Sequence, residues 1–188
     1  MLSAFLVFIS GCPYAWAIYK RKLKHPVVST WLLWLGIGML LFVASFQAGA
    51  KWSTTLLPIL MGVINPAIIV TLSIRYGKYK WTKIDTTCVI VCVVTVIVWQ
   101  TTNSFVLGIV GGVLADVVAS IPQVIKNWKD PKDEQVFSWA TFCFASSLNI
   151  LAIETWTIDH WLFPIYMTLM SSVLLLPLVL IRLKAVKA

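Results

Sequence analysis

The chain has 188 residues, of which 60% are hydrophobic and 12% are charged, and its formal net charge is +8 at pH 7. A composition this apolar cannot cover an ordinary soluble surface, so we expect a protein of the lipid bilayer. Basic clusters beside a bilayer reflect topology, and on this ground we exclude a nucleic-acid partner.

Seven stretches of the sequence are apolar enough to form helices that cross a bilayer. They cover residues 2–18, 30–49, 54–74, 84–100, 104–125, 137–156 and 161–181. A crossing helix needs about 20 apolar residues to span roughly 30 Å of hydrocarbon. Each segment must also satisfy its own backbone hydrogen bonds in lipid, and the sequence lacks the alternation of barrel strands. We therefore predict an all-α membrane protein with seven transmembrane helices.

The basic residues follow the odd-numbered predicted helices. They are Lys20, Arg21, Lys22, Lys24, Arg75, Lys78, Lys80, Lys83, Lys126, Lys129, Lys132, Arg182, Lys184 and Lys187. Only Lys51 lies on the other side. The positive-inside rule then places the N-terminus outside and the C-terminus in the cytoplasm. No basic residues precede the first stretch, so we interpret it as a helix and not as a cleaved signal peptide.

The two ends of the sequence resemble each other. Shifts of 109 and 106 residues align Pro13 with Pro122, Lys20 with Lys129, Ser29 with Ser138, Pro58 with Pro164 and Asn65 with Ser171. Two three-helix units have the same orientation only if one extra crossing separates them. We therefore predict parallel three-helix repeats at 1–82 and 104–188, joined by an inverting linker helix within 83–103.

Residues 120–129 read Ser-Ile-Pro-Gln-Val-Ile-Lys-Asn-Trp-Lys and resemble a PQ-loop repeat. Gln123, Asn127 and Ser138 match the family pattern, whereas Tyr14 replaces the glutamine in the first repeat. Helix by helix, the whole chain resembles the seven-helix form of the PQ-loop and SWEET transporter superfamily. This resemblance implies a transporter that moves a small polar solute, such as a sugar, an amino acid or a vitamin-like metabolite, by alternating access.

Two prolines and the neighbouring glutamine are candidate gating hinges. Proline removes an intrahelical hydrogen bond and bends a helix. Pro13 and Pro122, with Gln123 beside the second, occupy equivalent positions in the two repeats. A static packing kink is the alternative at each site, but the repeat symmetry favours a pair of hinges.

Asp116 is the principal candidate for mechanism because it lies near the middle of the fifth stretch. A carboxylate that faces lipid at that depth costs several kcal/mol, so it is expected to face the bundle interior. There it could bind the coupling proton or the cationic group of a substrate. A structural hydrogen bond to a serine or threonine of another helix is the alternative.

The other candidate substrate-binding residues are polar or aromatic groups at a similar depth. They are Asn65, Asn149, Ser120, Ser171 and Trp34. Asn65 resembles the midplane asparagine that SWEET relatives use to hold substrate, and Ser171 is its repeat mate. Asn149 needs several hydrogen bonds, whereas serines can bond back to their own helix. Trp34 could stack on a planar ligand or serve in packing.

The sequence offers no assembly of acid, base or metal ligands, so we expect neither an enzyme nor a metal or other cofactor. The four cysteines fall inside predicted helices and are interpreted as structural. Residues 161–181 contain no lysine, which excludes a retinal-binding photoreceptor. A sorting or ligand receptor similar to the KDEL receptors shares the predicted fold and remains the alternative function.

Both repeats lie in one chain, so a monomer is expected to contain a complete pathway, although oligomers are compatible with it. We expect an integral multi-pass protein of a prokaryotic inner membrane, with an organelle membrane as the alternative. Its expected partners are a small-molecule substrate and the lipid bilayer.

Overall fold

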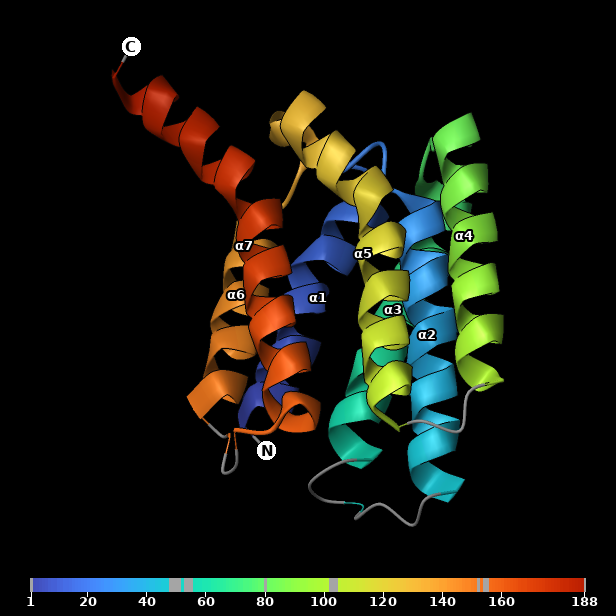
Figure 1. Ribbon diagram of the computed structural model, residues 1–188. Helices are drawn as coiled ribbons and strands as arrows, with labels where there is room; N and C mark the ends of the chain where they lie inside the picture. The colour runs from blue at the N-terminus through green and yellow to red at the C-terminus, as the bar shows by residue number, and fades with distance from the viewer. Residues whose placement is uncertain are drawn as a thin grey trace.

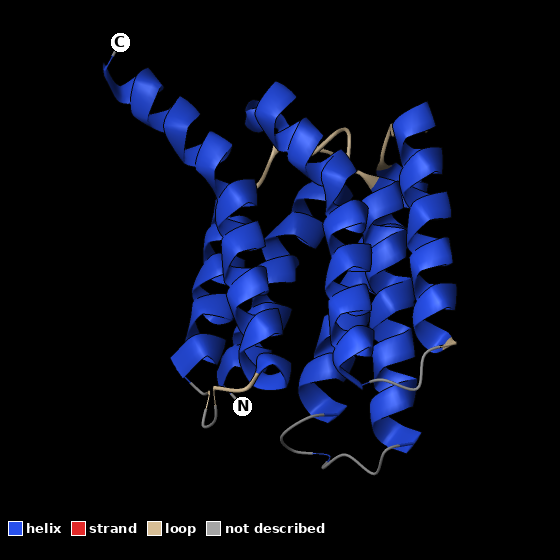
Figure 2. Ribbon diagram, viewed as in Figure 1, coloured by secondary structure: helices blue, strands red, loops and turns tan. Residues whose placement is uncertain are grey.

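The structure is a computed structural model that describes residues 2–47, 52, 56–79, 81–101, 105–151, 153 and 156–187. The described residues form helices and loops without any strand (Figure 2). The long helices are α1 (Leu2–Tyr19), α2 (Val28–Gln47), α3 (Leu57–Tyr76), α4 (Lys83–Gln100), α5 (Phe105–Lys129), α6 (Val136–Leu151) and α7 (Ile158–Lys187). The prediction of an all-α chain with seven helices is confirmed at this level.

The helix boundaries differ from the predicted stretches mainly in the second half. The helix α5 continues to Lys129 and α7 to Lys187, whereas α6 ends at Leu151, before the predicted limit. A hydropathy pattern marks only the apolar run, but a helix can extend through polar turns. The lysines in the last turn of α5 suit the negative end of its dipole. Lys51, Lys80 and the predicted boundaries at 49, 54, 103 and 104 lie outside the described residues.

The helices α1, α3, α5 and α7 finish at the same end of the bundle, at the top of Figure 1. We call this the basic end because the lysines and arginines follow these four helices. The C-terminus lies there, and the N-terminus lies at the opposite end (Figure 1). The short 3-10 helix η2 (Pro131–Asp133) connects α5 to α6 at the basic end.

The helix contacts follow the same pattern among α1, α2 and α3 as among α5, α6 and α7. The helix α3 packs against α1 and α2, and α7 packs against α5 and α6. Contacts between α1 and α6 and between α2 and α5 join these two groups. The helix α4 packs on α5 and touches α2. Within the described residues, the backbone of α1 comes within 8 Å of neither α2 nor α5, and only side chains reach between them.

Much of the bundle surface is apolar. On α4, the large apolar side chains Ile90, Val93, Val94, Ile97 and Val98 are exposed, while Cys88 and Cys92 are buried. Among the described residues, two stretches are long and apolar enough to cross a membrane: Ile59–Tyr76 in α3 and Trp161–Lys184 in α7. Shorter apolar helical stretches cover Phe5–Tyr19, Val28–Leu40 and Val136–Leu151.

Prolines lie inside several of these helices without ending them. Pro13 lies within α1, Pro122 within α5, and Pro164 and Pro177 within α7. Figure 1 shows that α5 and α7 change direction along their length. Internal prolines account for such bends because each removes a backbone hydrogen bond and crowds the preceding turn.

Candidate functional site

Asp116 lies on α5 and pairs with a tyrosine of α7. The Tyr166 hydroxyl donates a hydrogen bond to Asp116 Oδ2 at 2.5 Å. This distance is at the short end of the range for O–H···O hydrogen bonds. Asp116 therefore faces a neighbouring helix, and its partner is a tyrosine instead of the serine or threonine considered from the sequence.

The hydroxyl groups of Ser120 and Ser171 bond back to their own helices. Ser120 Oγ donates to the backbone oxygen of Asp116 at 2.8 Å, and Ser171 Oγ donates to that of Thr168 at 3.0 Å. Both serines are buried. This local bonding is common for serine in helices and satisfies the hydroxyl without a ligand.

Asn65 joins α3 to α1 through a close contact. Asn65 Nδ2 donates to the backbone oxygen of Val7 at 3.2 Å. Its amide lies against Gly11, where an added Cβ would come within 1.6 Å of Asn65 Oδ1. Glycine at position 11 therefore makes room for the asparagine. The repeat alignment pairs Gly11 with Ser120 and Asn65 with Ser171. At these two positions the first half has a glycine and a larger polar residue, whereas the second half has a serine at both.

Trp34 belongs to an aromatic cluster that joins α1, α2 and α6. Its ring centroid lies 5.0 Å from that of Trp31 and 6.3 Å from that of Trp139. Tyr14 extends the cluster, with its ring 5.0 Å from Trp31. The buried Trp34 Nε1 has no hydrogen-bond acceptor among the described residues. Asn149 is partly buried on α6.

Gln123 ties the basic end of α5 to the loop that follows and, through Asn127, to α7. Gln123 Nε2 donates to Asn127 Oδ1 at 2.7 Å and to Glu134 Oε1 at 2.9 Å. Asn127 Nδ2 in turn donates to the backbone oxygen of Leu174 at 2.8 Å. Gln123 and Asn127 are both fully buried. The glutamine that matches the family motif thus organises a polar network inside the bundle.

Glu134 is the acceptor on which this network converges. Its Oε1 accepts from Lys126 Nζ at 2.5 Å and from the Tyr14 hydroxyl at 3.3 Å, in addition to Gln123. Its Oε2 accepts from Trp139 Nε1 at 3.0 Å. The residue is only 4% exposed. A carboxylate buried this deeply requires such donors, and a charged partner above all.

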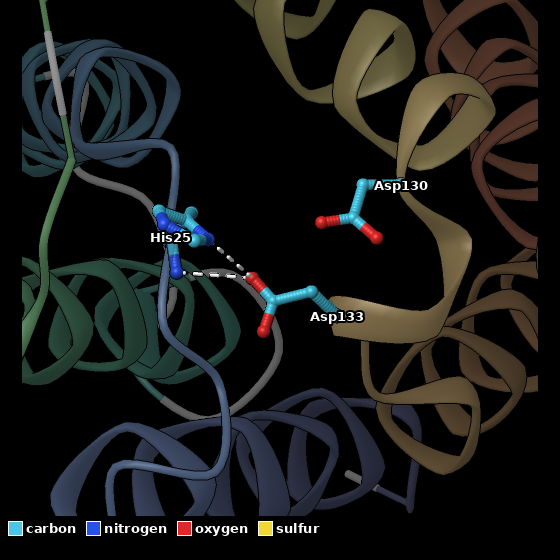
Figure 3. Close-up of side chains that lie close together, drawn as sticks. All are labelled: His25, Asp130 and Asp133. Carbon is cyan, nitrogen blue, oxygen red and sulfur yellow. Dashed lines mark hydrogen bonds and ion pairs between the residues drawn. The ribbon is translucent and has the colours of Figure 1, made fainter.

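Asp133, beside Glu134, holds the loop that follows α1. Asp133 Oδ1 accepts from the backbone N–H of Lys24 at 2.9 Å, and Oδ2 accepts from that of His25 at 3.0 Å. The His25 ring adds a contact of 3.3 Å from Nδ1 to Oδ2. Figure 3 shows His25 and Asp133 facing each other across the two loops, with Asp130 close by.

The potential ligand atoms of His25, Asp130 and Asp133 lie within 4.8 Å of one another. The Asp133 oxygens are already engaged by N–H donors, and Lys126 Nζ lies 3.5 Å from Oδ2. Burial alone would raise the pKa of Asp133, but the Lys24 and His25 amides and the Lys126 charge outweigh it and lower the pKa. This geometry favours a hydrogen-bonded contact between loops over a cation site.

Asp85 is a second buried carboxylate at the basic end, in the first turn of α4. It accepts from Ser29 Oγ at 2.5 Å and from the Tyr79 hydroxyl. Thr82 supplies its backbone N–H at 2.6 Å and its hydroxyl at 2.5 Å. Burial, followed by the hydrogen bond to Asp85, raises the pKa of Tyr79 above its ordinary value, so this phenol remains a donor. Among the described residues Asp85 forms no ion pair.

The sequence predicted no role for these acidic residues. Asp85, Asp133 and Glu134 are instead central acceptors, and Tyr166 is the unforeseen partner of Asp116. The available signal was the pair of acidic residues 133–134, which lies among lysines directly before the α6 helix. Loop acids near many cations are usually solvated, so this pattern did not indicate burial.

Comparisons with models of protein families, with curated proteins and with solved structures found no match for this chain.

Proposed function

We propose that the chain is a multi-pass membrane protein whose seven helices cross the bilayer, with the basic end on the cytoplasmic side. The apolar stretches of α3 and α7 and the exposed apolar side chains of α4 support this. The placement of lysines and arginines at one end agrees with the positive-inside rule. A prokaryotic inner membrane is the proposed location.

We further propose that residues 1–82 and 104–188 are parallel repeats joined by a linker helix. The support is the matched set of neighbours: α3 relates to α1 and α2 as α7 relates to α5 and α6. Exchanging the two halves also exchanges the α1–α6 contact with the α2–α5 contact. A pseudo-two-fold relation of this kind predicts both sets of contacts at once.

The proposed activity is transport of a small polar solute by alternating access, with the path between the two halves. The observation that carries this proposal is that the two contacts between the halves, α1 with α6 and α2 with α5, are equivalent under the repeat. Because they are equivalent, one half can rock against the other while forming few new contacts. The proline and glutamine at 122–123 add the resemblance to the PQ-loop and SWEET superfamily.

Asp116 is the proposed mechanistic residue. It lies on α5, which contacts both α7 in its own half and α2 in the other half. Tyr166 donates a hydrogen bond to the Asp116 carboxylate. A coupling proton or the cationic group of a substrate can take the place of this donor. Asn65, Asn149, Ser120, Ser171 and Trp34 are retained as candidate residues of the solute path.

The proposal is tested with purified protein in liposomes, using a panel of sugars, amino acids and nucleoside-like vitamins at two values of external pH. We expect uptake of one class of solute. Asp116→Asn should abolish accumulation driven by a pH gradient while retaining exchange or downhill flux. Asp130→Asn, which makes the same change at an exposed position, is the matched control.

Two results would contradict this scheme. Uptake by Asp116→Asn with unchanged pH dependence and affinity would make Asp116 structural. Failure to move any solute, combined with tight binding of a peptide or protein, would favour the receptor related to the KDEL receptors over the transporter.

A further inference from the structure

We infer that Glu134 is a positioning residue for the proposed transport cycle. Side chains of both halves donate hydrogen bonds to its carboxylate, and the basic end opens when the donor of the first half separates from it. The inference rests on the proposed function. Its structural basis is a pair of equivalent positions, one in each half, whose side chains donate hydrogen bonds to the same carboxylate oxygen.

Tyr14 and Gln123 each follow a proline and are aligned by the shift of 109 residues. Both donate to Glu134 Oε1, at 3.3 Å and 2.9 Å. The backbones of the helices that carry them, α1 and α5, do not come within 8 Å of each other in the described part of the chain. The carboxylate therefore bridges two helices whose backbones are not adjacent. Tyrosine, which is longer than glutamine, reaches this acceptor from the more distant helix.

When the basic end opens, some hydrogen-bond partners of Glu134 can stay bonded to it and others must separate from it. Gln123, Lys126 and Trp139 belong to the same half as Glu134 and lie on either side of η2. Tyr14 lies in the other half and makes the longest of the four side-chain bonds. Because Lys126 remains beside the carboxylate, withdrawal of Tyr14 does not strand a buried charge.

Asp133 adds a second contact across the same boundary. Its oxygens accept the backbone N–H groups of Lys24 and His25, which belong to the loop after α1. These two bonds use backbone donors, and the His25 ring adds its own contact of 3.3 Å to Oδ2. The Tyr14 bond and these two amide bonds thus form one latch, defined as the contacts of Asp133 and Glu134 with the first half. In the present structure the latch is closed.

The latch is small compared with the whole interface between halves, so its strength can set how often the basic end opens. A few hydrogen bonds can shift a two-state equilibrium by an order of magnitude or more, since every 1.4 kcal/mol is tenfold. Removing the latch should therefore favour an open basic end without unfolding the helices.

The test measures distances between spin labels at the two ends in a background whose native cysteines are replaced by alanine. Exposed residues Lys22 and Lys132 carry the labels at the basic end, and exposed Phe46 and Leu151 carry them at the opposite end. We expect Tyr14→Phe combined with Asp133→Asn to populate longer distances at the basic end, by about tenfold over the parent. Distances at the opposite end should stay the same or shorten.

The matched control is Asp130→Asn in the same loop, which should give the parent distribution. The inference is overturned if Tyr14→Phe with Asp133→Asn behaves like this control, or if both ends lengthen together, as a general loss of packing would cause. Tyr14→Phe alone retains the ring that packs on Trp31 and should give a partial shift in a folded protein.

These measurements need no substrate, so they separate the latch from the transport proposal. A selective opening of the basic end in a protein that moves no solute would support the latch and contradict the transport proposal. Solute uptake with an unchanged distance distribution in the double variant would do the reverse.

Discussion

The two buried carboxylates of the basic end are satisfied in opposite ways. Asp85 is surrounded by neutral donors that come from α2 and from the connection leading into its own helix. Glu134 has a lysine at 2.5 Å and donors from α1, α5 and α6. The first arrangement fixes the turn that leads into α4 and ties it to α2 in the preceding part of the chain, whereas the second joins the first half to the second half. Burial alone therefore does not reveal what a carboxylate holds together.

The sharpest test of this difference is removal of the charged partner. Lys126→Met should lower the free energy of unfolding by about 3–5 kcal/mol, because it leaves the Glu134 charge buried without an ammonium. Denaturant unfolding in detergent measures the loss. Lys129→Met, in the exposed last turn of the same helix, is the control and should change little. If Lys126→Met were not partly rescued by Glu134→Gln, the charge argument would be wrong.

The corresponding change at the neutral site should be smaller and local. Asp85→Asn weakens several hydrogen bonds without stranding a charge, and we expect a loss of about 2 kcal/mol in the free energy of unfolding. Hydrogen exchange should rise in the first turn of α4 and stay unchanged in the loop after α1. Faster exchange in that loop would show that the two sites are coupled and would erase the contrast between them.

The contact between Gly11 and Asn65 tests a different contrast between the halves. Gly11→Ala forces the Asn65 amide to move and to lose its bond to Val7, which should cost about 1 kcal/mol in unfolding free energy. Adding Asn65→Ser, which copies the Ser171 side of the repeat, should recover most of the loss. A double variant less stable than Gly11→Ala alone would contradict this size matching.

The smallest expected effect is the pH dependence of the loop contact at Asp133. Because its pKa is lowered in the folded protein, its contribution is present at neutral pH and is lost as the pH falls through that lowered value. Protection of the Lys24 and His25 amides, corrected for intrinsic exchange, should stay constant from pH 7 to about pH 5, well above the ordinary aspartate pKa of about 3.9. Loss of protection near pH 6 would assign the contact to another group.

The sequence predicted the number and order of helices well because each apolar stretch is long and is separated from the next by polar or basic residues. It also placed Gln123 on the fifth helix, but its predicted limit at 125 left Asn127 outside the helix, whereas α5 continues to Lys129. It could not predict the convergence on Glu134, since that depends on how α1 and α5 are spaced in three dimensions. The pairing of Asp116 with Tyr166 was missed for the same reason: position along a helix does not identify the neighbour.

The bond between Tyr14 and Glu134 joins residues 120 positions apart, whereas Ser29 and Asp85 are 56 positions apart. A ribosome adds about 5–20 residues per second, so Tyr14 must wait roughly 6–24 s longer than its own synthesis before its acceptor exists. The Asp85 site can form while the second half is still being made. During that interval the backbone N–H groups of Lys24 and His25 lack the Asp133 acceptor that holds them in the complete protein. The contact between Tyr14 and Glu134 is therefore completed later than the Asp85 site at the same end of the bundle.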